Sequence, residues 1–129
     1  MFPSQGCLRQ AKYAADFHFS NMLRVKFLRS PHSHALIRKI DVTEAARYPG
    51  VQAVIVGEEL PVTFGVLPTS PDETAMAVGK VRYVGEIVAA VAAETEQAAA
   101  EAVDLIHVEF QLLRSFLTPE DALAPCSCC

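Results

Sequence analysis

The chain has 129 residues, a formal net charge of −4, 51% hydrophobic residues and 20% charged residues, which is typical of one folded domain. Its longest apolar run, Ile87–Ala93, is seven residues long, whereas a membrane helix needs about 20, so no transmembrane segment is expected. The first ten residues do not pair a basic start with an apolar stretch, so no secretory signal is expected. Without a Lys/Arg cluster, nucleic-acid binding is not expected either.

The four cysteines lie close to the two ends of the chain, at Cys7, Cys126, Cys128 and Cys129. A disulfide framework distributes its cysteines through the fold, and this spacing does not. We therefore expect a reduced, cytoplasmic protein.

Four regular elements are predicted in the first half of the chain. Alternation of apolar and polar residues, or short apolar runs between turn residues, indicates three strands, and a short helix stops at Pro49-Gly50. In chain order they are strand Leu23–Leu28, strand Ala35–Val42, helix Thr43–Arg47 and strand Val51–Val56. Asp41 and Thr43 are candidate N-caps, and Asp41 with Glu44 has the spacing of a capping box.

The second half begins with an irregular, proline-punctuated loop at 57–77, a length that is often functional or packed on a neighbour. The helix in this half has Thr95 as its N-cap, several alanines, and a narrow apolar stripe of Ala98, Ala102 and Leu105. The elements are strand Val78–Val84, turn Gly85–Glu86, strand Ile87–Ala93, helix Thr95–Leu105, strand Ile106–Phe110 and a helical turn opened by Thr118–Asp121.

This order of elements predicts a mixed α/β or α+β domain with about six to seven strands and two main helices. Each half of the chain contains a strand, a helix and a further strand, so the halves weakly repeat each other.

His32 and His34 are the first candidate metal ligands, because residues two apart on a strand face the same side. A third ligand with diagnostic spacing is missing, and plain polar surface explains both histidines equally. Cys126, Cys128 and Cys129 could supply thiolates, but zinc and iron–sulfur sites usually need four ligands with different spacing. An incidental terminal tail is the preferred interpretation.

The acidic and hydroxyl side chains form no recognisable catalytic arrangement. Glu58 and Glu59 have no nucleophile or electrophile beside them and are interpreted as solvated. Ser30 and Ser33 lie near the two histidines but outside any nucleophile-elbow motif. No glycine-rich phosphate loop is present. These residues alone indicate a folded domain without a visible catalytic site.

An ordered set of short motifs resembles the N-terminal a/b hammerhead domain of the molybdenum-binding large subunit in the xanthine dehydrogenase/aldehyde oxidase family. The resemblance runs over residues 9–124, which leaves an N-terminal tail at 1–8 and a Cys-rich tail at 125–129. The motifs are Ala11–Asp16, Met22-Leu23, Leu28–Ala35, Ile40-Asp41, Ala45, Pro49–Val51 and Val81–Ala89.

Within that family, two stretches are most similar to the alpha subunit of 4-hydroxybenzoyl-CoA reductase. They are Leu60–Pro68, followed by Asp72-Glu73, and Leu117–Ala122. The resemblance implies a parent enzyme with a molybdenum–pterin cofactor, iron–sulfur clusters and FAD. That reductase removes a phenolic hydroxyl from an aromatic acyl-CoA, whereas other branches hydroxylate purines or aldehydes or oxidise carbon monoxide.

The same resemblance limits what this chain can do alone. The family's molybdopterin contacts and catalytic glutamate follow the hammerhead, and its iron–sulfur cysteines belong to another subunit or domain, so no catalytic, cofactor-binding or metal-binding residue is carried onto this sequence. The sequence departs from the family at Arg9, where Gly is usual, and at Ser20-Asn21, where Pro-Gly is usual. The expected continuation is lost after Ala124, which suggests a truncated or frame-shifted copy.

The resemblance therefore implies a scaffold domain whose partners are the molybdopterin-binding domains of the large subunit and the iron–sulfur and FAD subunits. An apolar loop should not stay exposed, so a docking surface is predicted at the 57–77 loop, with Phe64, Val66 and Leu67, and at the turn of Val84, Gly85 and Glu86. Three alternatives remain. The chain could be a fragment of a xanthine, aldehyde or carbon monoxide dehydrogenase-type subunit, a standalone binding or assembly module, or a metal-binding domain that uses the Cys-rich tail with His32 and His34.

Overall fold

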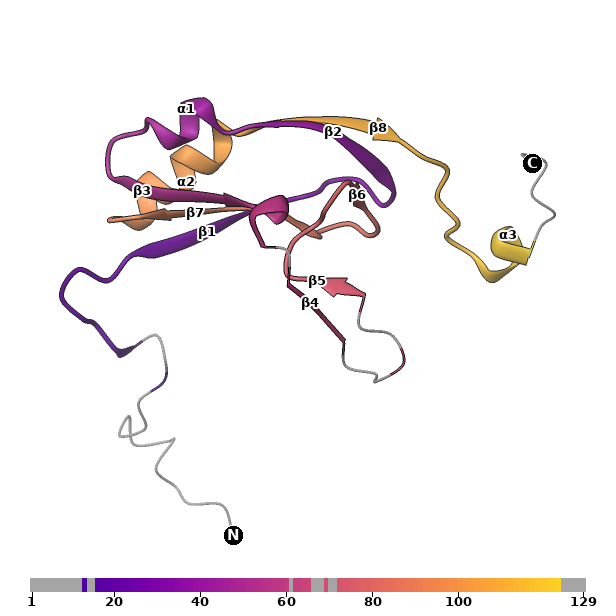
Figure 1. Cartoon of the computed structure of the whole chain (residues 1–129), viewed down its shortest axis with the longest axis horizontal. Helices are drawn as coiled ribbons and strands as arrows, with labels where there is room; N and C mark the ends of the chain where they lie inside the picture. Colours follow the sequence, from indigo (N-terminus) through magenta and orange to yellow (C-terminus); the bar gives the residue numbers. More distant parts are fainter. Residues whose placement is uncertain (1–12, 14–15, 61, 66–68, 70–71, 124–129) are drawn as a thin grey trace, which may run out of the picture.

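The computed structural model describes residues 13, 16–60, 62–65, 69 and 72–123 (Figure 1). The tails at 1–8 and 125–129, with all four cysteines, lie outside these residues, as do Val66 and Leu67. The described strands are β1 (Arg24–Arg29), β2 (Ala35–Asp41), β3 (Val51–Val56), β4 (Thr63–Phe64), β5 (Glu73–Thr74), β6 (Lys80–Val81), β7 (Ile87–Ala93) and β8 (His107–Leu112). The helices are α1 (Thr43–Ala46), the 3-10 turn η3 (Gly57–Glu59), α2 (Glu96–Asp104) and α3 (Pro119–Leu123). The predicted α+β class is confirmed.

The larger structural unit is an antiparallel sheet in the order β1-β7-β3. Its central strand β7 carries mostly alanine and valine, and small side chains let neighbouring elements approach closely. Helices α1 and α2 both pack on one face of this sheet. Strands β1 and β3 flank β7. Their pairings begin at Arg24↔Ala93 and Val51↔Ala93, and the register shifts between Leu28 and Arg29 in β1 and between Val51 and Ala53 in β3.

A second antiparallel sheet has the order β6-β2-β8. The weak repeat in the sequence becomes two strand–helix–strand units, β2-α1-β3 and β7-α2-β8. Strand β3 pairs with β7, and β2 pairs with β8, so the two units interlock. Each sheet therefore takes strands from both halves of the chain.

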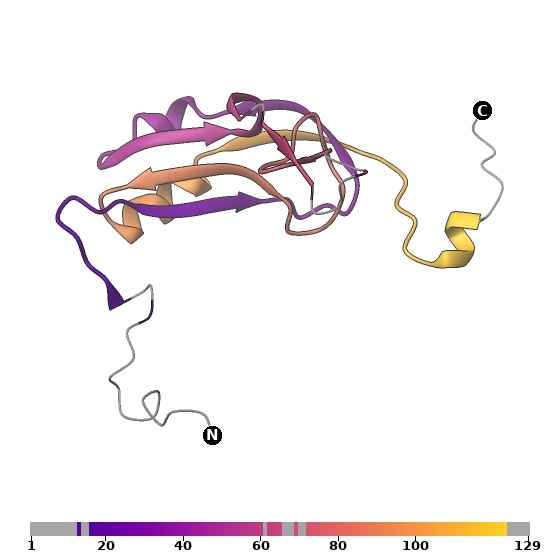
Figure 2. The same cartoon turned by 60° about the horizontal axis from the view of Figure 1, so that its bottom comes forward.

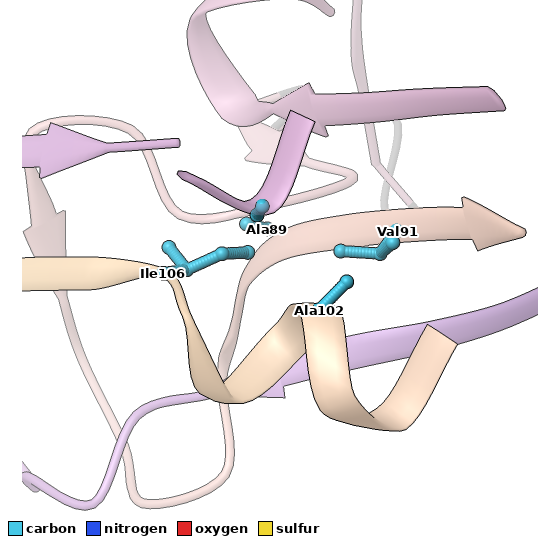
Figure 3. Packing of buried hydrophobic residues seen from close by; sticks show 5 residues of the cluster. Ala89, Val91, Ala102 and Ile106 are labelled. Atoms are coloured by element: carbon cyan, nitrogen blue, oxygen red, sulfur yellow. The ribbon is translucent and has the colours of Figure 1, made fainter. Parts of the chain in front are cut away.

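Helix α2 confirms its predicted cap, because the Thr95 hydroxyl accepts a hydrogen bond from the Ala98 amide at 3.1 Å. The predicted apolar stripe is partly wrong, since Ala99 and Ala102 are the buried residues of the helix. Figure 3 shows Ala102 directed toward Val91 of β7, with Ile106 beside Ala89. This cluster is the main core, and α2 closes it.

Helix α1 begins one residue later than the predicted capping box requires. Val42 occupies the N-cap position, so Asp41 cannot form the box with Glu44. The Asp41 carboxylate instead accepts a hydrogen bond from the Thr43 amide at 3.1 Å. Hydrogen bonding with Thr43 lowers the pKa of Asp41 below its ordinary value.

The two helices are joined by a hydrogen bond from the Tyr48 hydroxyl, just after α1, to the carboxylate of Glu101 on α2. This bond raises the pKa of Tyr48 and lowers the pKa of Glu101. It ties α1 to α2 on the outer side of the sheet.

The predicted strand Val78–Val84 is wrong over most of its length, because only Lys80–Val81 pairs with β2. Gly79 adopts a positive φ of 69° before the strand. After it, the Arg82 amide donates to a side chain instead of a neighbouring strand. The loop predicted as irregular at 57–77 contains η3 and the β4–β5 hairpin. In the described part of the chain, no helix combines the length and apolarity needed to cross a membrane.

Candidate docking site at the Arg82–Glu86 turn

The candidate site is the turn between β6 and β7, supported by the segment between β1 and β2. Glu86 is only 7% exposed, although it carries a carboxylate. That carboxylate accepts hydrogen bonds from the Arg82 amide at 2.5 Å and from Arg82 Nη1 at 3.2 Å. A buried carboxylate must be paired and hydrogen-bonded to remain stable, so Arg82 and Glu86 together determine the shape of the turn.

Backbone hydrogen bonds attach this turn to the buried Ser30. The Ser30 amide donates to the Glu86 carbonyl at 2.9 Å, and the Gly85 amide donates to the Ser30 carbonyl at 2.8 Å. Arg29 Nη1 donates to the Gly85 carbonyl at 2.8 Å. Gly85 has a φ of 89°, a conformation that favours glycine. Hydrogen bonds with Arg29 and Ser30 therefore fix the backbone of the turn at Gly85 and Glu86.

The tip of the turn presents apolar side chains to solvent. Tyr83 is 60% exposed and Val84 is 64% exposed. Phe116 and Leu117, after β8, are also exposed, and the four line an open groove of about 430 Å³ with Ser33, His34, Arg82 and Ser115. A rigid turn that exposes apolar side chains is suited to bind another protein surface.

The β4–β5 hairpin lies next to the same turn. A hollow of about 230 Å³ is lined by Asp72, Glu73 and Thr74 on the hairpin side and by Arg82, Tyr83 and Glu86 on the turn side. Phe64, paired with Glu73 in the hairpin, is exposed. The structure thus brings the predicted loop and turn to neighbouring positions, although Glu86 acts from inside the turn and not on its surface.

The two candidate histidines have separate partners. The ring of His32 packs edge-on against Phe110, with centroids 5.0 Å apart. His34 Nδ1 lies 2.8 Å from the Arg114 carbonyl oxygen. Among the described residues, no group of three or more His, Cys, Asp or Glu side chains could hold a metal ion.

Three of the other polar candidates, Ser30, Ser33 and Glu59, have structural partners. The Ser30 hydroxyl exchanges hydrogen bonds with the backbone of His32 at 3.0 and 3.1 Å. The Ser33 hydroxyl lies 2.7 Å from that of Ser115. The Glu59 carboxylate accepts from the Val56 amide at 3.1 Å. These bonds organise turns and strand ends.

Sequence reasoning misses Tyr83, Phe116 and Leu117 as functional candidates. The predicted strand Val78–Val84 would place Tyr83 and Val84 on alternate faces of a sheet. Phe116-Leu117, an apolar pair directly before Thr118-Pro119, is the signal that the sequence offers.

Residues 9–114 match the family model described as "Aldehyde oxidase and xanthine dehydrogenase, a/b hammerhead domain". The chain is 42% identical over 118 residues to a probable xanthine dehydrogenase subunit of Bacillus subtilis (strain 168), covering 90% of this chain and 16% of that protein. It is 37% identical to the nicotinate dehydrogenase large molybdopterin subunit of Eubacterium barkeri, covering 88% of this chain and 27% of that protein.

The crystal structure of quinoline 2-oxidoreductase from Pseudomonas putida 86 superimposes with a TM-score of 0.81 at 36% identity. The superposition covers 94% of this chain and 16% of the quinoline enzyme chain. The chain therefore spans between about a sixth and about a quarter of the length of these relatives, as the covered shares of 16% and 27% show.

Proposed function

The chain belongs to the aldehyde oxidase and xanthine dehydrogenase family as its a/b hammerhead domain, and on this premise we propose that it is a non-catalytic scaffold domain of a molybdenum-cofactor oxidoreductase large subunit. We place the domain at residues 9–124. The observation that carries the proposal is the buttressed Arg82–Glu86 turn, which exposes Tyr83 and Val84 beside the hairpin of Phe64. We infer that this site docks onto the remaining domains of such a large subunit.

The resemblance to the family implies that the molybdenum–pterin, iron–sulfur and flavin groups of the complete enzyme are held by other domains and subunits, and we propose the same arrangement for this chain. Among the described residues, no group of three or more His, Cys, Asp or Glu could hold a metal ion.

The substrate of the parent enzyme has two candidates. The resemblance of Leu60–Pro68 and Leu117–Ala122 to the alpha subunit of 4-hydroxybenzoyl-CoA reductase supports reductive removal of a phenolic hydroxyl from an aromatic acyl-CoA in the cytoplasm. The names of the relatives, which refer to xanthine, nicotinate and quinoline, support oxidation of a nitrogen heterocycle. The assembled complex that contains this segment can be assayed with 4-hydroxybenzoyl-CoA and with xanthine, nicotinate and quinoline. Turnover of the acyl-CoA or of a heterocycle distinguishes the two candidate substrate classes.

Docking is tested by co-expressing the full chain with the Bacillus subtilis relative from which the matching segment has been removed. Phe64→Asp is expected to weaken co-purification about tenfold or more, because it introduces an unpaired charge into an apolar contact. Leu112→Asp is the matched control, since Leu112 is also exposed but lies on β8. Circular dichroism should show both variants folded.

Association of the wild-type chain together with selective loss in Phe64→Asp supports docking through the hairpin. Equal association of Phe64→Asp and wild type refutes the assignment of that surface. A wild-type chain that does not associate refutes the scaffold proposal and favours a standalone binding or assembly module.

A further inference from the structure

The β1-β7-β3 sheet carries its helices on one face only. The Lys26 ammonium of β1 lies 2.7 Å from the Glu96 carboxylate at the start of α2, so Lys26 is on the helix side. Because successive side chains on a strand alternate between faces, Val25 and Phe27 lie on the opposite side. Figure 2 shows the three strands broadside with α2 behind them.

The strand register extends this open face across the whole sheet. Val25 pairs with Ala92, which pairs with Ala53. Phe27 pairs with Ala90, which pairs with Ile55. We call these six residues the open face: Val25, Phe27, Ala53, Ile55, Ala90 and Ala92. All are apolar, and the central strand contributes only the methyl groups of Ala90 and Ala92 to the open face.

The open face is incompletely covered. Val25 is 50% exposed and Phe27 is 44% exposed, and Leu23, two residues before Val25, is exposed as well. At the other end of β7 the cover is complete, because Val88 packs with Ala77 and Val81 in a second core cluster. Exposed apolar patches of this kind mark interaction surfaces.

We infer that the open face is a second docking surface, occupied by an apolar, uncharged surface of the remaining domains of the large subunit. The inference rests on the proposed function. The Arg29 guanidinium lies over the Phe27 ring at one end of the open face, 6.0 Å from the ring centroid. None of the six side chains itself carries a polar group, so a charged group placed against Val25, Ala90 or Ala92 would lose its hydration without gaining a partner. The alanine floor at Ala90 and Ala92 lets a helix or a backbone segment approach closely.

The size of the relatives argues for this occupant against a second copy of the chain. This chain spans 16% of the Bacillus subtilis relative, so most of that relative lies outside the matched segment. In that relative the occupant would be joined to the hammerhead by the same polypeptide. A tethered surface has an effective concentration of about a millimolar, whereas a second copy must associate from dilute solution.

The test uses the full chain and, as the probe, the Bacillus subtilis relative without its matching segment. Phe27→Glu places a charge on the open face, and Ala100→Glu places the same charge on the exposed side of α2. Phe27→Glu is expected to raise the Kd of association about tenfold or more, whereas Ala100→Glu should leave it unchanged. Analytical ultracentrifugation of each chain alone measures self-association.

Both variants must keep the wild-type circular dichroism spectrum. If Phe27→Glu is unfolded, Val25→Thr, which keeps the shape of a half-exposed strand residue, replaces it and should weaken association less strongly. Equal binding by wild type and a folded variant overturns the open-face inference while the scaffold proposal stands. Self-association that Phe27→Glu abolishes assigns the face to a second copy and also overturns it. Absence of wild-type binding refutes the scaffold proposal itself.

Discussion

Removal of the buried carboxylate of Glu86 tests whether its interactions with Arg82 stabilise the Arg82–Glu86 turn. In Glu86→Ala, the Arg82 amide loses its acceptor at 2.5 Å and the Arg82 guanidinium loses its ion-pair partner at 3.2 Å. Glu86→Gln is the matched control, because its side-chain oxygen can still accept from the Arg82 amide while the charge is absent.

The size of the effect follows from the burial of the two partners. Hydrogen bonds to charged groups contribute about 1.5–3 kcal/mol, and loss of one partner of a fully buried pair costs about 3–5 kcal/mol. The Arg82 side chain is 48% exposed, so solvent screens its share of the interaction. We therefore expect Glu86→Ala to lower the free energy of unfolding by about 2 kcal/mol, and Glu86→Gln by about 1 kcal/mol.

Urea unfolding followed by circular dichroism measures both values, and thermal melts provide an independent check. For a domain of this size, a loss of about 2 kcal/mol corresponds to a decrease in Tm of about 8 °C. A loss below about 0.5 kcal/mol in Glu86→Ala, the range of ordinary surface substitutions, would refute the reasoning. An equal loss in the two variants would show that the charge, not the amide acceptor, holds the turn.

Two further predictions concern packing at Gly57 and the decrease of stability at acid pH. Gly57→Ala would place a Cβ atom 2.5 Å from the Ala77 carbonyl oxygen, and urea unfolding should show a loss of about 2 kcal/mol. Lys26 hydrogen bonding lowers the pKa of Glu96 below its ordinary value of 4.5, so this stabilisation is present above that pH and lost as the pH falls through the folded-state pKa. The urea midpoint should be stable near neutral pH and fall under acid conditions, and Lys26→Met should reduce that fall.

Most of the fold was predictable because its signals are local. Val51–Val56, which lies between Gly50 and Gly57, is apolar except for Gln52, and Ile87–Ala93 is a continuous apolar run. The structure shows both as strands with these limits. Thr95 followed by an alanine-rich segment predicts a capped helix, and α2 confirms it. Pairing order was not predictable, because β7 could receive neighbours from either half of the chain.

The candidate site was less predictable because it depends on contacts between distant residues. Alternation in Val78–Val84 indicates a strand, but the Glu86 carboxylate captures the Arg82 amide and bends the chain after Val81. Likewise, the sequence predicts only that Ser30, directly before Pro31, ends a strand. In the structure its backbone forms hydrogen bonds with Gly85 and Glu86, which are distant in the sequence. Helix and strand propensities depend on the local sequence, so they do not predict contacts with residues that are distant in the chain.

The two proposed docking surfaces differ in a way that the sheet architecture explains. The turn is a rigid point, because the Arg82–Glu86 pair and hydrogen bonds from Arg29 and Ser30 to its backbone limit its motion. The open face is a broad apolar surface whose six side chains form no hydrogen bonds. A turn that is fixed by hydrogen bonds and an ion pair can determine the orientation of a partner. An apolar face contributes association energy in proportion to the area that it buries. A hammerhead that used both would be positioned by Tyr83 and Val84 and stabilised by Val25 and Phe27.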